Sequence, residues 1–406
     1  MVSSTVDHMV AITVFLAATL LFIGLFNQTI QTAVIYQRHR ATATKASDLL
    51  DNMLLTPGIP INWGQNDSLP TGFGLQDPEF TQYKISSFSL MRLNSTSGTS
   101  VNYWKTGSYY SNITVGSKNF LLLSQNSVLN YSTALDLLGI RNQYGFQLTV
   151  KPIVTVSVTE NRAAGPLSLS LDVYGTGFPL ANAHVTYCLM TVELDGADGY
   201  PAYTTYYGTD DTDEKGSVTL SFSQVIDSDV SYALIAYAYL GGLVGVGYHE
   251  RVSSGDAYAI PFVDNLSEGR VLIAHSYDIE YAIPPSAELR YNASLVYLAE
   301  DFTLREMPLE SSYGRVNSSD VGVYGVVNIP TDNPGILIIP YQTGANEGGM
   351  VMMPWGVSPL AFPVVFGGDP RNQEWVATDM RQIIVGGITY QVTLALWSLE
   401  GYQVVG

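Results

Sequence analysis

The sequence is poor in the residues that build several common kinds of site. It holds one cysteine, Cys188, so neither an internal disulfide nor a thiolate metal centre is expected within these 406 residues. Cys188 lies in an alternating apolar run that predicts a strand, where a lone thiol acts as a small buried hydrophobe. Without disulfides the fold has to rely on its core, and a chain of this length with 46% hydrophobic residues can bury a large one.

Basic charge is scarce as well. Lys and Arg together number 18 against 36 Asp and Glu, which gives a formal net charge of −18, and charged residues make up only 13% of the chain. An acidic surface repels phosphate backbones, and no basic patch offsets that repulsion, so nucleic-acid binding is not expected. The length predicts two or three domains.

Patterns of catalytic residues are missing too. The five histidines include no pair at metal-ligand spacing, and no Gly-x-Ser-x-Gly nucleophile motif occurs. We therefore expect neither an enzyme nor a bound cofactor, and a membrane-anchored hydrolase is a distant alternative.

Two surface features are candidate binding sites. Closely spaced carboxylates are what Ca²⁺ prefers, although the spacing here is not that of an EF-hand and a solvated turn is the favoured interpretation. These carboxylates are Asp210, Asp211, Asp213 and Glu214, with Asp195 and Asp198 able to join only if their loop lies alongside. A tyrosine group could bind surface glycans or a neighbouring subunit, although ordinary packing on a strand face is favoured. It consists of Tyr200, Tyr203, Tyr206 and Tyr207.

One long hydrophobic run free of charge, Gly-poor and without Pro lies near the N-terminus. Residues 9–26 carry no charge and as a helix would span about 27 Å, close to the thickness of a bilayer core. The residues before this run include no Lys or Arg, and no Ala-x-Ala cleavage pattern follows it, so we expect a retained segment rather than a cleaved signal peptide. The residues that we assign to the membrane or to helix assembly are Val10, Ile12, Phe15, Leu16, Leu20, Leu21, Phe22, Ile23 and Phe26.

The predicted helix continues well past this run. No Gly or Pro occurs between Asn27 and Leu55, and apolar residues recur at helical spacing. Thr56-Pro57-Gly58 gives a sharp stop signal, so the helix is expected over about residues 4–55, some 75 Å if straight. Its first half is apolar all round, and its second half is amphipathic.

This helix resembles that of the type IV pilin superfamily, particularly its archaeal members. The resemblance covers about residues 1–60 and rests on the apolar helix, on the stretch Ala46-Ser47-Asp48-Leu49-Leu50 through Leu55-Thr56-Pro57-Gly58, and on Asn62-Trp63. It implies that the apolar helices of many copies pack together as a filament core. Precursors in that family also carry a short basic leader before the helix, and the residues before Val10 do not match it.

Two signals bear on which side of the membrane the remaining chain lies. Arg38, Arg40 and Lys45 follow the apolar run, and the positive-inside rule would place them in the cytoplasm. Eight Asn-x-Ser/Thr triplets favour the outside, where such sites are glycosylated. Seven are candidate glycosylation sites, namely Asn66, Asn94, Asn112, Asn130, Asn265, Asn292 and Asn317, while Asn27 lies too close to the membrane. We favour the outside.

The rest of the chain predicts a mainly β fold in three regions. Residues 57–151 read as a pilin-head-like α+β region, with strands at 83–93, 101–106, 119–123 and 146–150 and a short helix capped by Ser132 or Thr133. Residues 152–252 alternate like an immunoglobulin-like sandwich and resemble such domains of bacterial and archaeal surface proteins. Residues 257–406 predict a second β domain that contains a hairpin turning at Gly386-Gly387.

Two functions from different classes follow. The first is a structural subunit that polymerises through its N-terminal helix into a cell-surface filament, with itself and the membrane as partners. The second is a monomeric membrane-anchored adhesin or envelope protein that binds a glycan or a protein through its β domains.

Overall fold

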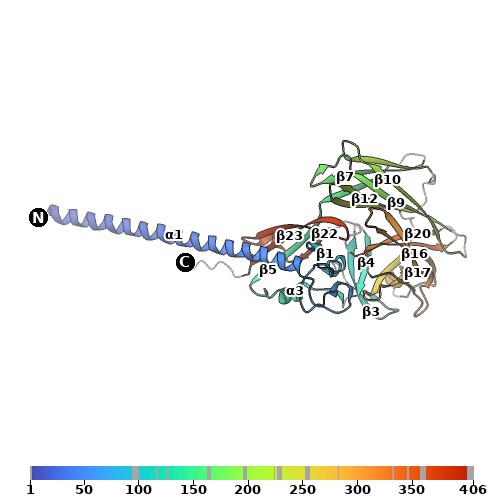
Figure 1. The fold of residues 1–406 in the computed structure, drawn as a ribbon. Coiled ribbons are helices and arrows are strands. Elements are labelled where there is room, and N and C mark those ends of the chain that lie inside the picture. Colours follow the sequence, from blue (N-terminus) through green and yellow to red (C-terminus); the bar gives the residue numbers. More distant parts are fainter. Residues whose placement is uncertain are drawn as a thin grey trace.

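The protein is mainly β, with one long N-terminal helix that projects from a β-rich head (Figure 1). In this computed structural model the described residues are 2–93, 100–115, 118–124, 127–161, 166–194, 199–223, 225, 231–251, 257–281, 283–331, 333–344, 347–356 and 363–399. The expected fold class, a long helix followed by β-sheets, is confirmed.

The helix α1 spans Val2–Leu55 without interruption and ends just before Thr56, as the Pro-Gly stop signal predicts. Its first part projects away from the head (Figure 1), and its last part enters the head core. The apolar residues of the second half that are buried there are Ala46, Leu49, Leu50, Met53 and Leu54.

A five-stranded sheet receives the end of this helix, which packs against β22 and β23. In spatial order its strands are β1 (Lys84–Ile85), β22 (Ala377–Val385), β23 (Ile388–Ser398), β5 (Tyr144–Pro152) and β21 (Val364–Gly367). The predicted hairpin is confirmed, because Val385 pairs with Ile388 around two glycines that both have positive φ, 54° and 82°. The predicted strand at 146–150 lies within β5.

The predicted strand at 83–93 is wrong for most of its length. Only Lys84–Ile85 is a strand, and Ser87–Leu93 forms the helix α2. The apolar and polar residues alternate as in a half-exposed strand. Every residue of α2 is buried, however, so the alternation does not distinguish a buried face from a solvent-exposed one. The Ser86 hydroxyl also accepts a hydrogen bond from the Ser89 amide at 3.3 Å, which caps the helix.

Two further sheets complete the head. One has the order β18 (Gly325–Asn328), β15 (Arg270–His275), β14 (Ala259–Asn265), β4 (Lys118–Ser124), β3 (Ser108–Val115) and β2 (Val101–Tyr103). The other has the order β17 (Leu304–Asn317), β16 (Glu288–Leu298), β19 (Gly335–Gly344) and β20 (Glu347–Trp355).

The regions 57–151 and 257–406 are not separate in these sheets. β5 pairs with β23 over nine residue pairs, from Tyr144↔Ser398 to Pro152↔Tyr390, and β4 pairs in parallel with β14. Strands from both regions therefore form one body, into which residues 152–252 are inserted. Local patterns could not reveal this, because strand pairing across such separations leaves no local mark on the sequence.

The inserted region has the sandwich-like arrangement that its alternation predicts. Its strands follow the order β10 (Ala202–Asp211), β9 (His184–Glu193), β12 (Tyr232–Leu240), β13 (Leu243–Arg251), β6 (Val154–Glu160), β7 (Leu167–Gly175) and β11 (Ser217–Phe222), and β8 (Phe178–Pro179) pairs with β7. Leu169 and Leu171 of β7 share a core with Leu189 of β9 and Leu234 of β12, so the sheet curves over its own core.

The outer face of this sandwich is buried against the main body. Cys188 of β9 and Ile235 of β12 belong to the core of the head rather than to that of the sandwich. β12 is therefore covered on both faces, and seven of its nine residues are buried, which explains its nearly continuous apolar sequence.

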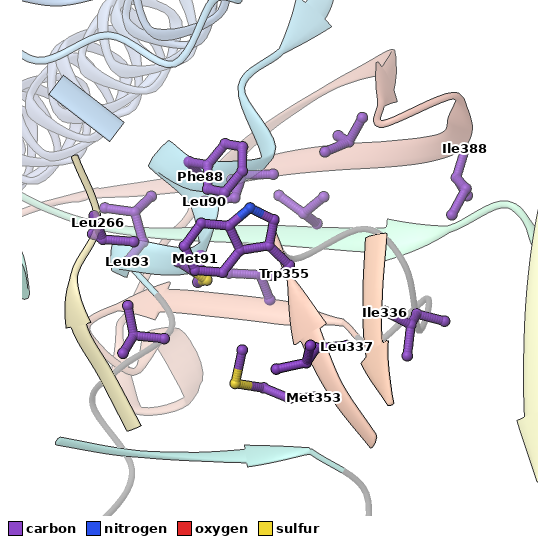
Figure 2. Close-up of a cluster of buried hydrophobic side chains, with 14 of the residues drawn as sticks. Phe88, Leu90, Met91, Leu93, Leu266, Ile336, Leu337, Met353, Trp355 and Ile388 are labelled. Carbon is purple, nitrogen blue, oxygen red and sulfur yellow. The ribbon is translucent and has the colours of Figure 1, made fainter. Parts of the chain in front are cut away.

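The main core joins elements that lie far apart in the sequence. Figure 2 shows Phe88, Leu90 and Met91 of α2 close to Trp355 and Met353 of β20. The rings of Phe88 and Trp355 meet edge to face, with centroids 5.4 Å apart.

The remaining helices are short. The predicted helix near residue 133 is α3 (Tyr131–Leu137), but its cap is Asn130, whose side chain accepts a hydrogen bond from the Thr133 amide at 2.8 Å. The predicted caps, Ser132 and Thr133, are therefore wrong, since both lie inside the first turn. Trp63–Gln65 and Pro370–Asn372 form 3-10 turns, and α4 covers Tyr277–Glu280.

Candidate membrane and assembly helix

The first part of α1 exposes its apolar side chains. All nine residues assigned from sequence to the membrane or to assembly lie on this helix and are at least half exposed, from 54% at Ile23 to 70% at Phe15 and Phe22. Among the described residues this is the one helix long and apolar enough to cross a membrane. A surface of this kind is stable in a bilayer or against other apolar helices, and it is costly in water.

The middle of α1 exposes a second, narrower apolar face. Residues 27–41 lie between the uncharged run and the docked end, and we call this segment the stalk. Ile30 and Val34 lie one turn apart on it and are 45% and 42% exposed. A lone helix of about this length is only marginally stable in water. The stalk therefore gains from any partner that covers this face.

The end of α1 is fixed to the head by polar contacts as well as by its core residues. The Arg381 guanidinium on β22 donates to both carboxylate oxygens of Asp51 at 3.0 and 3.2 Å and to the Ser47 hydroxyl at 3.1 Å. It also donates to Asp379 at 2.8 Å. At the point where the helix reaches the head, His39 stacks on Trp375 with ring centroids 4.1 Å apart.

These contacts shift the pKa of the groups involved. Hydrogen bonds to Asp51 and Asp379 raise the pKa of Arg381. Burial acts to raise the pKa of Asp379, but hydrogen bonds from Ser47 and Arg381 outweigh it and hold that pKa below its usual value. The pair Arg381–Asp379 is thus favoured in its charged form, and Arg381 also links Asp51 and Ser47 of α1 to β22.

The acidic group does not gather into a metal site. Asp210 and Asp211 end β10, and Asp211 lies 3.0 Å from His184 Nδ1 across the strand pair. Asp213 accepts hydrogen bonds from the Lys215 and Ser217 amides, both at 2.8 Å, and these bonds lower its pKa. Glu214 lies in the same turn.

This arrangement is that of a capped turn between β10 and β11. No group of three or more His, Cys, Asp or Glu in the described ranges is arranged to hold a metal ion. Asp195 and Asp198 lie outside those ranges.

The four tyrosines do not form one patch. Tyr206 packs toward the core of the sandwich, and Tyr203 on the opposite face donates a hydrogen bond to Glu306 of β17. Tyr200 instead meets Tyr313 of β17, with ring centroids 5.2 Å apart, and both rings are exposed. The alternation of β10 places Tyr206 on the opposite face from Tyr203 and Tyr207, and Tyr200 lies before the strand begins.

The candidate glycosylation sites differ in their geometry. In Asn66 and Asn317 the side-chain oxygen accepts hydrogen bonds from both the amide and the hydroxyl of the serine two residues later. Asn265 accepts from the Ser267 hydroxyl and from the Glu268 amide. Asn265 and Asn317 are the last residues of β14 and β17, and Asn66 follows the 3-10 turn Trp63–Gln65.

The other candidate asparagines lie in different settings. Asn292 is within β16, between β17 and β19, and Asn130 caps α3 with an exposed side chain. Asn112 lies on β3, and Asn94 lies outside the described residues.

Sequence patterns missed two buried basic residues. Arg92 of α2 is fully buried, and its guanidinium donates to the backbone oxygens of Trp63, Asn66, Ser68 and Ser127. Burial lowers its pKa to about 10. Arg92 thereby fixes the loop after α1 to the head. The second residue is Lys105, whose side chain is completely inaccessible to solvent.

Comparisons with known proteins place the chain in no family. No family model matches it, and no curated protein sequence matches it. Two solved structures share parts of its shape at 10% identity and a TM-score of 0.17. One is the sporulation control protein Spo0M of Bacillus subtilis, with 50% of this chain and 90% of that chain covered. The other is red sea bream transglutaminase, with 61% and 37% covered. Likenesses at this level carry no argument about fold or function.

Proposed function

We propose that this protein is a structural subunit of a cell-surface filament. It polymerises through the projecting part of α1 and displays its β-rich head outside. The observation that carries the proposal is that α1 continues as one helix, with an exposed apolar face, for some 15 residues beyond the length that a bilayer covers.

The length of the helix separates anchoring from assembly. Residues 9–26 are enough to cross a bilayer core. From Phe26 to Thr42, where the helix becomes buried, α1 rises about 24 Å further. Plain anchoring gives no reason for Ile30 and Val34 to be apolar over this distance. Packing against the same helix in neighbouring copies explains these apolar residues, because such packing covers both the apolar run and the stalk.

The resemblance of residues 1–60 to archaeal type IV pilins supports the same proposal, since the helices of that family form the filament core. The candidate glycosylation sites of the head support an outside location, and two of them, Asn265 and Asn317, lie at the ends of strands.

The test is to shear cells and examine the released fraction. The proposal predicts intact protein in filaments of regular helical repeat, with α1 at their centre. Recovery of the protein only as a monomer in the membrane fraction would contradict it. Glycopeptides from the head would support the outside location, and protection of the head inside the cytoplasm would overturn it.

A matched pair of variants sharpens the test. Val34→Glu places a charge on the apolar face of the stalk, and Thr32→Glu places the same charge roughly opposite on the helix. Glu favours a helix at both positions. The proposal predicts that Val34→Glu abolishes filaments and that Thr32→Glu leaves most of them. A monomeric anchored protein would tolerate both equally.

The alternative is a monomeric adhesin anchored by α1. The observation that favours it is the exposed pair Tyr200 and Tyr313, since paired aromatic rings on a surface are a common platform for sugars. Glycan-array binding that is lost in Tyr313→Ala, together with an absence of filaments, would establish this alternative.

A further inference from the structure

A lysine and an aspartate meet in the interior of the head, away from α1. Lys105 lies in the turn between β2 and β3, and Asp278 lies on α4. The Lys105 Nζ is 3.1 Å from Asp278 Oδ2, and both side chains are completely inaccessible to solvent. Tyr103 and His275, which adjoin them, are also completely buried.

The surroundings of Lys105 orient its amino group. Its Nζ donates to the backbone oxygen of Val323 at 2.8 Å and to that of Asn317. A neutral amine has two N–H bonds and one lone pair. When the two carbonyl oxygens take both N–H bonds, the lone pair faces the third neighbour, which is the carboxyl group of Asp278.

The two carboxyl oxygens of Asp278 differ in their hydrogen bonding. Oδ2 accepts hydrogen bonds from the His275 backbone amide at 3.3 Å and from the Tyr103 hydroxyl at 3.4 Å. Oδ1 is buried and has no hydrogen-bond partner among the described residues. Donors gathered on one oxygen stabilise the negative charge that develops there when a nucleophile attacks the carbon. Oδ1 is then the oxygen that can depart as the leaving group.

Burial also favours the neutral forms of both groups. It raises the pKa of Asp278 and lowers the pKa of Lys105, in each case more than the partner's charge opposes it. Burying both charges of an ion pair costs a large desolvation free energy. An amide carries no net charge and avoids most of this cost. Holding an amine against a carboxylic acid also supplies an effective concentration of about 10⁵ M or more.

We propose that Lys105 and Asp278 are joined by an intramolecular amide bond between Lys105 Nζ and Asp278 Cγ. The neutral amine attacks the carbon of the protonated carboxyl group, and the charge that forms on Oδ2 is held by the His275 amide and the Tyr103 hydroxyl. Oδ1 leaves as water with the carboxyl proton and one amine proton. One C–N bond forms and one C–O bond breaks, and no oxidant or other reactant is needed.

Such a bond would cross-link the edge of a sheet. Figure 1 shows β3 in the head, far from the projecting part of α1. β2 is the edge strand beside β3, and the amide would tie their hairpin to α4, which follows β15 in the same sheet. A covalent tie between distant segments restricts the unfolded chain as a disulfide does, in a protein with a single cysteine. The inference does not depend on filament assembly.

Mass spectrometry of the full-length denatured protein tests the proposal directly. After tryptic digestion and deglycosylation, we expect residues 93–118 and 271–290 to be joined in one species, lighter by one water than the sum of the two peptides. Cleavage after Lys105 should be lost, while cleavage after Lys118 proceeds. Lys105→Arg serves as the control, since it keeps a basic side chain and forms no such bond, so the linked species should disappear.

The wild-type protein alone can overturn the proposal, whether or not the variant folds. Complete cleavage after Lys105, together with an unlinked peptide 271–290 of its full sequence mass, would show that the two residues form only an ion pair.

Discussion

The projecting and docked parts of α1 belong to one uninterrupted helix, yet they meet opposite environments. Leu50 and Met53 near its end are completely buried in the head, whereas Phe15 and Phe22 near its start are 70% exposed. Both parts are rich in apolar residues, so composition does not separate them. The docked part has polar residues on its outer side and contacts β22 through Arg381, whereas residues 9–26 of the projecting part are apolar all round.

This difference shows what each part requires. An amphipathic helix needs one covering surface, which the head supplies, and a helix that is apolar all round needs cover on every side. Within the described chain nothing covers the projecting part. A bilayer can cover residues 9–26, and neighbouring copies can cover these residues together with the stalk.

The largest effect is expected from removing the projecting part. Deletion of residues 2–38 takes away the exposed apolar surface and leaves the buried residues from Thr42 onward. We expect a soluble, folded, monomeric head, measured by sedimentation and by a cooperative unfolding transition. A deletion protein that stays in the membrane pellet would show that the head itself binds membranes.

The next effect concerns a single core side chain. Leu50→Ala opens a cavity in the head core and should lower the free energy of unfolding by about 2–5 kcal/mol. Ile30→Ala on the stalk should change the stability of the head by less than about 0.5 kcal/mol, because Ile30 is exposed and lies outside the head core. Urea denaturation followed by tryptophan fluorescence measures both. Equal effects would contradict the division of α1 into two parts.

A smaller effect is expected at the base of the helix. Arg381→Gln removes a half-exposed ion pair with Asp51 and should cost about 1 kcal/mol. The matched control is Arg371→Gln, which breaks the exposed pair with Asp369 and should leave the stability of the head essentially unchanged. Hydrogen exchange of residues 42–55 should rise in the first variant only.

The smallest effect is a dependence on acid. The pKa of Asp379 in the folded head lies below its unfolded value of about 4, so its contribution to stability is complete above that value. The contribution is lost as the pH falls through the lower, folded pKa. Asp379→Asn should therefore destabilise the head at pH 7 and make less difference near pH 2, and an equal difference at both values would contradict the assigned role.

The sequence predicted those elements whose signals are local. The Pro-Gly stop after Leu55, the Gly386-Gly387 hairpin and the alternating strands of the sandwich all rest on neighbouring residues, and the structure has them where they were expected. The pairing of β5 with β23 joins segments far apart in the chain, and no local pattern marks it.

The interior polar residues could not be predicted for a related reason. Arg92 and Lys105 look like ordinary surface charges in the sequence, because burial of a basic side chain depends on the carbonyl groups that gather around it in the fold. The helix α2 could not be predicted either. Its residues alternate as in a strand, and their complete burial depends on elements that are distant in the sequence. The long apolar helix could be predicted, since length and hydrophobicity alone define that segment.

The central claim is that copies of this chain pack together along the stalk, and cysteine cross-linking tests it most directly. The native Cys188 is buried, so a cysteine introduced at Val34 would be the accessible thiol. Val321→Cys, at an 80% exposed position on the head, is the control. On mild oxidation of intact cells, the account predicts covalent dimers for Val34→Cys and few for Val321→Cys. Monomers alone for Val34→Cys, in cells that contain the full-length protein, would contradict it.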